Sequence, residues 1–230
     1  MAAALKLHAA QMRFPLRRET RTDRAAFVLG DSNRAAAEAL DAWPDASAPV
    51  LAIVGPAGAG KSHLGAVWAE RTGAASLKGA EAALVDLPAL EARPVFLDDA
   101  DQADDETLFH LINLAHASGG ALLLASREPP ALWETPLPDL RSRLDAMRVV
   151  RVEAPDDAVL GAVLRRLFAE RAITPGDDLI DYLLRRIERS VPAARDVVER
   201  LDQESGARPI NRLLARDILD RDAATGELFG

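Results

Sequence analysis

The segment GPAGAGKS at residues 55–62 constrains the fold of this 230-residue chain more than any other feature. It follows a continuous apolar run at 48–55, which is typical of a buried strand, and precedes a helical pattern at 61–72. A strand, a glycine-rich loop and a helix in this order match the phosphate-binding pattern G-x-x-x-x-G-K-[ST]. The sequence therefore predicts a P-loop at the end of a strand in an α/β sheet.

The residue types of this loop suit the phosphates of a nucleotide. Glycine lets the backbone curl so that its N–H groups point inward, and the following helix adds the positive end of its dipole. Lys61 is expected to reach the outer phosphates, and the Ser62 hydroxyl is expected to ligate Mg²⁺. We predict that the cofactor, ADP or ATP with Mg²⁺, is held by Gly55, Pro56, Ala57, Gly58, Ala59, Gly60, Lys61, Ser62 and His63.

A second apolar run, PVFLDD at 94–99, ends on two carboxylates. The carboxyl ends of parallel strands form the ligand-binding edge of an open α/β sheet, so both side chains are expected near the P-loop. We predict that Asp98 holds Mg²⁺, directly or through water, and that Asp99 orients an attacking water. The alternative is a solvated acidic loop, because the sequence continues as DDADQADDE.

The chain divides by its pattern into three parts. Residues 1–24 form an arginine-rich arm, residues 25–153 an α/β nucleotide-binding domain, and residues 154–230 a domain with helical stripes and no strand signal. Buried strands that alternate with helices predict a parallel sheet flanked by helices, followed here by a small all-helical lid domain. The further elements expected are a helix at 106–118, strands at 121–126 and 147–155, and helices over 160–168, 179–187, 192–205 and 209–221.

Composition narrows the class of protein. A net charge of -8 argues against tight duplex binding by the whole surface, because neutralising phosphates requires a basic footprint. The absence of cysteine excludes a disulfide framework and thiolate chemistry. The N-terminal apolar run is interrupted by Lys6 and His8, which argues against a signal peptide, and no uncharged apolar run approaches the ~20 residues of a membrane span. We therefore expect a cytoplasmic protein without a membrane partner.

Six segments, in this order along the chain, resemble the DnaA-related branch of AAA+ ATPases, and most closely its Hda subgroup. In the family they are the segment before the first strand, the Walker A loop, the Walker B strand, sensor 1, the arginine-finger segment and the sensor 2 helix. Here they read FVLGDSN at 27–33, GPAGAGKSH at 55–63, VFLDDAD at 95–101, LLLASREPP at 122–130, LPDLRSRLDA at 137–146 and VPAARDVVERLD at 191–202. The resemblance implies a P-loop AAA+ module with a lid, associated with the nucleoid and replisome.

The resemblance also implies roles for two arginines. Arg143 aligns with the arginine finger, which reaches a nucleotide on a neighbouring subunit and stabilises charge at its γ-phosphate. The sequence alone leaves Arg141 as a similar candidate. Arg195 aligns with sensor 2, near the start of a helix, where a cation is unfavourable unless a phosphate lies close by. The predicted catalytic residues are thus Asp99, Arg143 and Arg195, and Arg195 is also expected to contact the nucleotide.

Three departures from the family pattern bear on what this chain does. Arg127 stands at sensor 1, where the family often has a small polar or acidic residue, and Ser126 is the nearest polar candidate. We therefore expect weak turnover by the protein itself. Ala146 and Met147 stand where relatives often have Trp-Gly. On length, we expect one AAA+ module with an arm and not a full DnaA initiator.

The arm contains the segment QMRFPL at 11–16. Apolar anchors on a tether suit binding in a partner's groove, and proline lowers the entropy lost on binding. The spacing resembles the sliding-clamp-binding motif that the Hda subgroup carries at its N-terminus. The alternative is an arm that packs on its own domain. The residues implied to bind the DNA polymerase sliding clamp are Gln11, Met12, Phe14, Pro15 and Leu16.

The resemblance implies a negative regulator of replication initiation. Bound to the clamp and holding ADP, it would meet ATP-bound DnaA and insert Arg143 toward that ATP to promote hydrolysis. Contact with DNA is expected to be indirect, and the sequence leaves open direct DNA contact by the arm, the preference for ADP or ATP, and homo-oligomer formation. The alternative is a self-sufficient AAA+ ATPase that remodels a replication partner, such as a helicase loader. A small-molecule kinase is disfavoured, because no acceptor pocket is evident.

Overall fold

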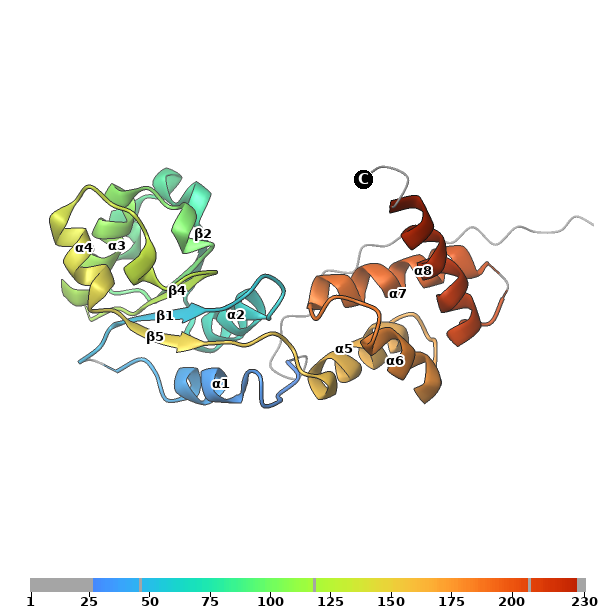
Figure 1. Cartoon of the computed structure of the whole chain (residues 1–230). Helices are drawn as coiled ribbons and strands as arrows, with labels where there is room; N and C mark the ends of the chain where they lie inside the picture. The colour runs from blue at the N-terminus through green and yellow to red at the C-terminus, as the bar shows by residue number, and fades with distance from the viewer. Residues whose placement is uncertain (1–26, 46, 118, 207, 227–230) are drawn as a thin grey trace, which may run out of the picture.

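The computed structural model describes residues 27–226 except 46, 118 and 207. Two units follow one another along this part of the chain, a sheet flanked by helices and then a bundle of helices (Figure 1). The predicted arm, with QMRFPL, lies outside the described residues. Within residues 27–226, apart from the three gaps, no helix is long and apolar enough to cross a membrane.

The sheet has five parallel strands in the order β2-β3-β4-β1-β5. Every residue of the three central strands is buried, which explains their continuous apolar sequences, whereas the two edge strands are partly exposed. The predicted parallel sheet is thereby confirmed. The strands are β1 (Val50–Val54), β2 (Ala75–Lys78), β3 (Val95–Asp98), β4 (Leu122–Ser126) and β5 (Arg148–Arg151).

Helices cover both faces of the sheet. Alternate residues of β1 pack into two different cores: Leu51 and Ile53 join α1 and α2, whereas Ala52 joins α3 and α4. The side chains of neighbouring strands in register lie on the same face, so this alternation holds across the sheet. The helices are α1 (Arg34–Asp41), α2 (Lys61–Thr72), α3 (Asp105–Ala117) and α4 (Pro138–Asp145), with short 3-10 turns η2 (Gly79–Leu84), η3 (Leu87–Leu90), η4 (Ala100–Gln102) and η5 (Pro130–Leu132).

The helical unit has a core of its own. The stripes read from the sequence meet there: Leu160, Leu164 and Phe168 of one helix pack with Leu179 and Leu183 of the next. These side chains are almost fully buried. The small all-helical unit expected after the sheet is therefore present. Its helices are α5 (Asp157–Ala169), α6 (Asp177–Leu184), α7 (Val191–Ser205) and α8 (Arg212–Gly226).

The segment at 27–33 joins the two units. The Asp156 carboxylate caps α5 by accepting from the Val159 N–H at 2.8 Å, and it also accepts from the Ser32 N–H at 3.2 Å. The bond from Val159 holds the pKa of Asp156 below its usual value, and the bonds from Ser32 add to this effect. The Ser32 carbonyl accepts from the Glu153 N–H at 2.9 Å. The segment is thus bonded to both the end of the sheet and the first helix of the bundle.

Candidate nucleotide-binding site

The P-loop occupies the carboxyl end of β1, where the chain turns into α2. Gly58 and Gly60 have positive φ angles, 72° and 100°, so the loop curls as the sequence pattern predicts. No side chain caps α2, and the first-turn N–H groups of Lys61, Ser62 and His63 have no acceptor within the helix. An uncapped helix start that follows a curled glycine loop suits an anion such as a phosphate.

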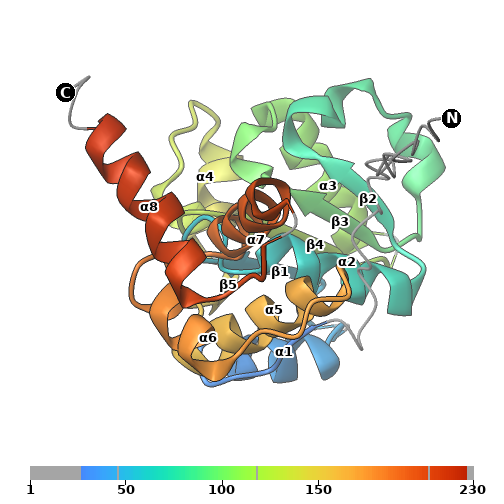
Figure 2. The ribbon, with the colours of Figure 1, turned by 90° about the vertical axis from the view of Figure 1, so that its right-hand side faces the viewer.

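The helical unit touches this loop directly. The Val191 N–H, at the start of α7, donates to the Gly58 carbonyl at 3.1 Å. A Cβ atom at Gly58 would lie 2.5 Å from Ser190 Cβ and 2.9 Å from Pro192 Cδ, so only glycine fits there. Figure 2 shows α7 end-on in front of β1 and α2. The helical bundle therefore contacts the P-loop through the start of α7.

The ammonium group of Lys61 lies against its own loop. Its Nζ donates to the carbonyls of Gly55 at 2.8 Å and Pro56 at 2.9 Å. Burial lowers the pKa of Lys61, the nearby Asp98 and Asp99 carboxylates oppose this effect, and Arg127 adds to it. Arg127, directly after β4, is thus close enough to Lys61 to act on its charge. Ser126 is buried and donates to the Glu128 carbonyl at 2.7 Å.

The two predicted Mg²⁺ ligands meet. The Ser62 hydroxyl donates to Asp98 Oδ1 at 2.9 Å, and Asp98 is buried at 5% exposure. Among the described residues no group of three or more His, Cys, Asp or Glu side chains forms a metal site. A hydroxyl and one carboxylate nevertheless fit Mg²⁺, which keeps several waters and takes further oxygens from phosphates. These residues would hold the ion, which would neutralise phosphate charge.

Sequence reasoning missed Lys78, the last residue of β2. Its ammonium is bonded to Asp98 Oδ2 and lies 3.5 Å from Asp99 Oδ2. Burial by itself would lower the pKa of Lys78, but the bond to Asp98 and the charges of both carboxylates together raise it. The contact arises because β2 lies beside β3 in the sheet. It could not be predicted, because the sequence pattern did not identify β2 as a strand.

The two candidate arginines of α4 have different environments. Arg141 is bonded to the Trp133 carbonyl, to the Pro130 carbonyl at 3.3 Å and to Asp145 at 2.7 Å. The Arg143 guanidinium lies 5.3 Å from the centre of the Phe109 ring, and in the described chain it has no carboxylate partner. Arg141 therefore supports the local fold, whereas the head group of Arg143 is available for another contact.

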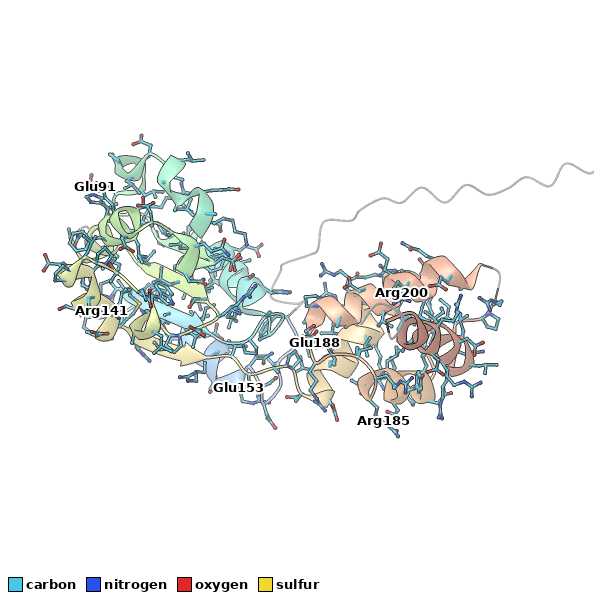
Figure 3. The ribbon with its side chains drawn as sticks, turned by 45° about the horizontal axis from the view of Figure 1, so that its top comes forward. Glu91, Arg141, Glu153, Arg185, Glu188 and Arg200 are labelled. Atoms are coloured by element: carbon cyan, nitrogen blue, oxygen red, sulfur yellow. The ribbon has the colours of Figure 1, made fainter. Side chains whose placement is uncertain are left out.

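Arg143 lies on α4, which is on the side of the sheet opposite α1 and far from the helical bundle (Figure 1). In Figure 3, Arg141 of the same helix marks this distant end, whereas Glu188 lies on the side of the bundle that faces the sheet.

Arg195 is one turn into α7, the helix that contacts the P-loop, and it is half-buried. His63 stacks edge-on against Phe27 with ring centres 5.4 Å apart.

Sequence comparison finds DnaA proteins, and no family model matches the chain. The DnaA of Cutibacterium acnes is 28% identical in an alignment of 200 positions that covers 72% of this chain and 39% of that protein. The DnaA of Sphingopyxis alaskensis is 30% identical over 118 residues, which are 50% of this chain and 26% of that protein. The chain thus spans well under half the length of these curated relatives.

Solved structures agree on the fold. Domain III of Thermotoga maritima DnaA superimposes with a TM-score of 0.69 at 20% identity, covering 85% of this chain and 94% of that one. The chain is DnaA-like in sequence and has the fold of DnaA domain III. AMPPCP-bound DnaA from Aquifex aeolicus gives 0.64 at 20% identity over 77% of this chain and 64% of that one. A Thermotoga maritima RuvB variant gives 0.65 at 16% identity over 86% and 71%.

The contact between α7 and the P-loop predicts an unequal response to two glycine substitutions. Gly58→Ala and Gly73→Ala both place a side chain at positive φ, which costs about 1–2 kcal/mol. Only Gly58→Ala also meets Ser190 and Pro192, since nothing lies within 4 Å of a Cβ at Gly73. We expect Gly58→Ala to lower the free energy of unfolding by about 1–3 kcal/mol more than Gly73→Ala, measured by urea unfolding. Equal losses would contradict the close contact between α7 and the P-loop.

Proposed function

We propose that this DnaA-like protein is an Hda-type regulator of replication initiation. It holds ADP in its P-loop, binds the sliding clamp through residues 11–16 and stimulates hydrolysis of the ATP bound to DnaA. The observation that supports this proposal most is that Arg143 has no carboxylate partner in the described chain and lies on α4, a helix far from the helical bundle (Figure 1). We infer that this arginine serves a nucleotide on another molecule.

The P-loop supports the first part of the proposal. A curled glycine loop, an uncapped helix start and the Ser62–Asp98 pair are the parts that hold a nucleotide and its metal. AMPPCP occupies the related DnaA of Aquifex aeolicus. The half-buried Arg195, one turn into the helix that touches the loop, is suited to a phosphate contact. In this role the nucleotide joins the helical unit to the sheet and is held without being turned over.

Removing the Lys61 ammonium tests nucleotide binding. Lys61→Ala should weaken ADP and ATP binding by at least about tenfold, because it deletes a charge-assisted contact to phosphate. Calorimetric titration measures both affinities. Arg151→Ala is the matched control. It removes an exposed cation from the end of β5, the edge strand that pairs with β1. Unchanged affinity in Lys61→Ala would exclude the P-loop as the binding site.

Arg143 acts on the partner's nucleotide by electrostatics. Its guanidinium would face the γ-phosphate of ATP on DnaA, where negative charge grows as the phosphate bond breaks and water attacks. Within the described chain the Arg143 guanidinium contacts the Phe109 ring, an interaction that contributes about 0.5–1 kcal/mol. The ring therefore orients the arginine and releases it at small cost when a phosphate is offered.

Replacing Arg143 separates an activator of another ATPase from a self-sufficient ATPase. Arg143→Ala should lower the free energy of unfolding by no more than about 1 kcal/mol and should keep its own nucleotide, because the guanidinium loses its contact with the Phe109 ring but no carboxylate partner. Stimulation of hydrolysis on DnaA should fall toward background, since arginine fingers contribute about 10³–10⁵ in rate. The assay follows labelled ATP on DnaA becoming ADP in the presence of clamp-loaded DNA.

Two arginines serve as controls for this assay. Arg148→Ala removes an exposed cation just after α4 and should leave stimulation intact. Arg141→Ala should instead lower the free energy of unfolding by about 1.5–3 kcal/mol, because two carbonyls and Asp145 lose a charged donor. Full stimulation by Arg143→Ala, together with steady ATP turnover by the isolated protein, would favour the self-sufficient ATPase.

Clamp binding is expected to depend on the apolar side chains of the arm. Phe14→Ala in the full chain should weaken binding to the clamp by about tenfold or more, because a buried phenylalanine contributes about 1.5–3 kcal/mol. Arg18→Ala, outside the apolar segment, should leave the affinity unchanged. Surface plasmon resonance on immobilised clamp measures both variants and a peptide of residues 8–20. A peptide that does not bind, with Phe14→Ala equal to wild type, would assign the arm another role.

A further inference from the structure

The lysine at the end of β2 lies where a divalent cation is expected to act. We propose that Lys78 is a built-in counter-cation of the Asp98–Asp99 pair, which competes with Mg²⁺ and lets the site hold a nucleoside diphosphate with little dependence on the metal. The proposal rests on the proposed nucleotide binding and deepens it. It names the metal requirement of that site and the residue that sets it.

The strand register places the ammonium. Lys78 is the partner of Asp98 across the parallel pair β2 and β3, so both side chains lie on the same face. That face is the one of α2, because Phe96, two residues before Asp98, packs in the core with α2. Ser62, at the start of α2, donates to Asp98 Oδ1 while Lys78 donates to Oδ2. Both carboxylate oxygens therefore already have a donor.

The backbone holds the three charged groups together. A Cβ atom at Gly79 would lie 2.0 Å from the Asp99 carbonyl oxygen, so the chain after Lys78 passes directly against the backbone of Asp99. Asp99 itself has a left-handed conformation, with φ of 51°, which leaves its Oδ2 at 3.5 Å from the Lys78 ammonium. A lysine on a freely moving loop would not be constrained in this way.

The charges explain the effect on metal binding. Two adjacent carboxylates repel a polyphosphate and attract a divalent cation, whereas one ammonium between them halves their net charge. The side chain of Asp98 is only 7% exposed, so the local interaction is weakly screened by water. The Lys78 side chain is 53% exposed, and a metal ion must displace it before it can take the same oxygen. Weak metal binding agrees with a site that retains ADP and turns over little ATP.

Metal affinity without nucleotide tests Lys78 independently of the proposed function. Mn²⁺ is titrated into the nucleotide-free full chain and followed by electron paramagnetic resonance. We expect Lys78→Gln to bind Mn²⁺ at least about tenfold more tightly than wild type, and Lys78→Arg to resemble wild type. Arg151→Gln, the same charge change at the end of the other edge strand, should have no effect. Equal Mn²⁺ affinity in wild type and Lys78→Gln would overturn the proposal.

A second measurement uses ADP with Mg²⁺ or with EDTA. Wild-type affinity should change by less than about threefold between the two, whereas Lys78→Gln should lose about tenfold in EDTA and regain it with Mg²⁺. The same metal dependence in both proteins would overturn the proposal. If neither binds ADP, the proposed nucleotide function fails and the Mn²⁺ titration alone decides on Lys78. Lys78→Met replaces Lys78→Gln if thermal melting shows that the latter is unfolded.

Discussion

The parallel direction of the five strands determines the rest of this structure. Because all strands run the same way, their carboxyl ends meet at one edge, and the loops that follow β1, β3 and β4 are brought together there. Residues separated by more than 60 positions in the chain, from Lys61 to Arg127, act on one another electrically as a result. The central strands must be buried on both faces to permit this arrangement, and their apolar sequences satisfy that requirement.

Three cationic side chains lie at this edge of the sheet, close to the two carboxylates that are expected to bind Mg²⁺. Lys61 lies on its own loop carbonyls, Lys78 on the two carboxylates, and Arg127 acts on Lys61 from β4. Such a balance favours retention of an anionic ligand over repeated metal-assisted turnover. On the opposite side of the sheet, Arg143 rests on Phe109 without a carboxylate partner in the described chain. This separation of the two sites is the basis of the function proposed above.

The strongly patterned parts of the chain could be predicted from the sequence. Continuous apolar runs identified β1, β3 and β4, and the stripes of α5 and α6 identified the helical core, because burial alone selects those residues. The short elements β2, α1 and α4 were not predicted from the sequence. The β2 sequence, ASLK, alternates only weakly, and α4 begins at Pro138 and contains few apolar residues. The sequence pattern predicted that Ser62 and Asp98 both lie at the P-loop, and the structure adds the hydrogen bond between them. The contacts of Lys78 and the different environments of Arg141 and Arg143 required tertiary structure.

The hydrogen bond from the Val191 N–H to the Gly58 carbonyl attaches the start of α7 to the P-loop. The helix has 15 residues and is therefore about 22 Å long. By geometry, a tilt of about 10° at Gly58 would displace the far end of α7 by about 4 Å. Because α8 shares a core with α7, the outer end of the bundle would be displaced further than the loop itself.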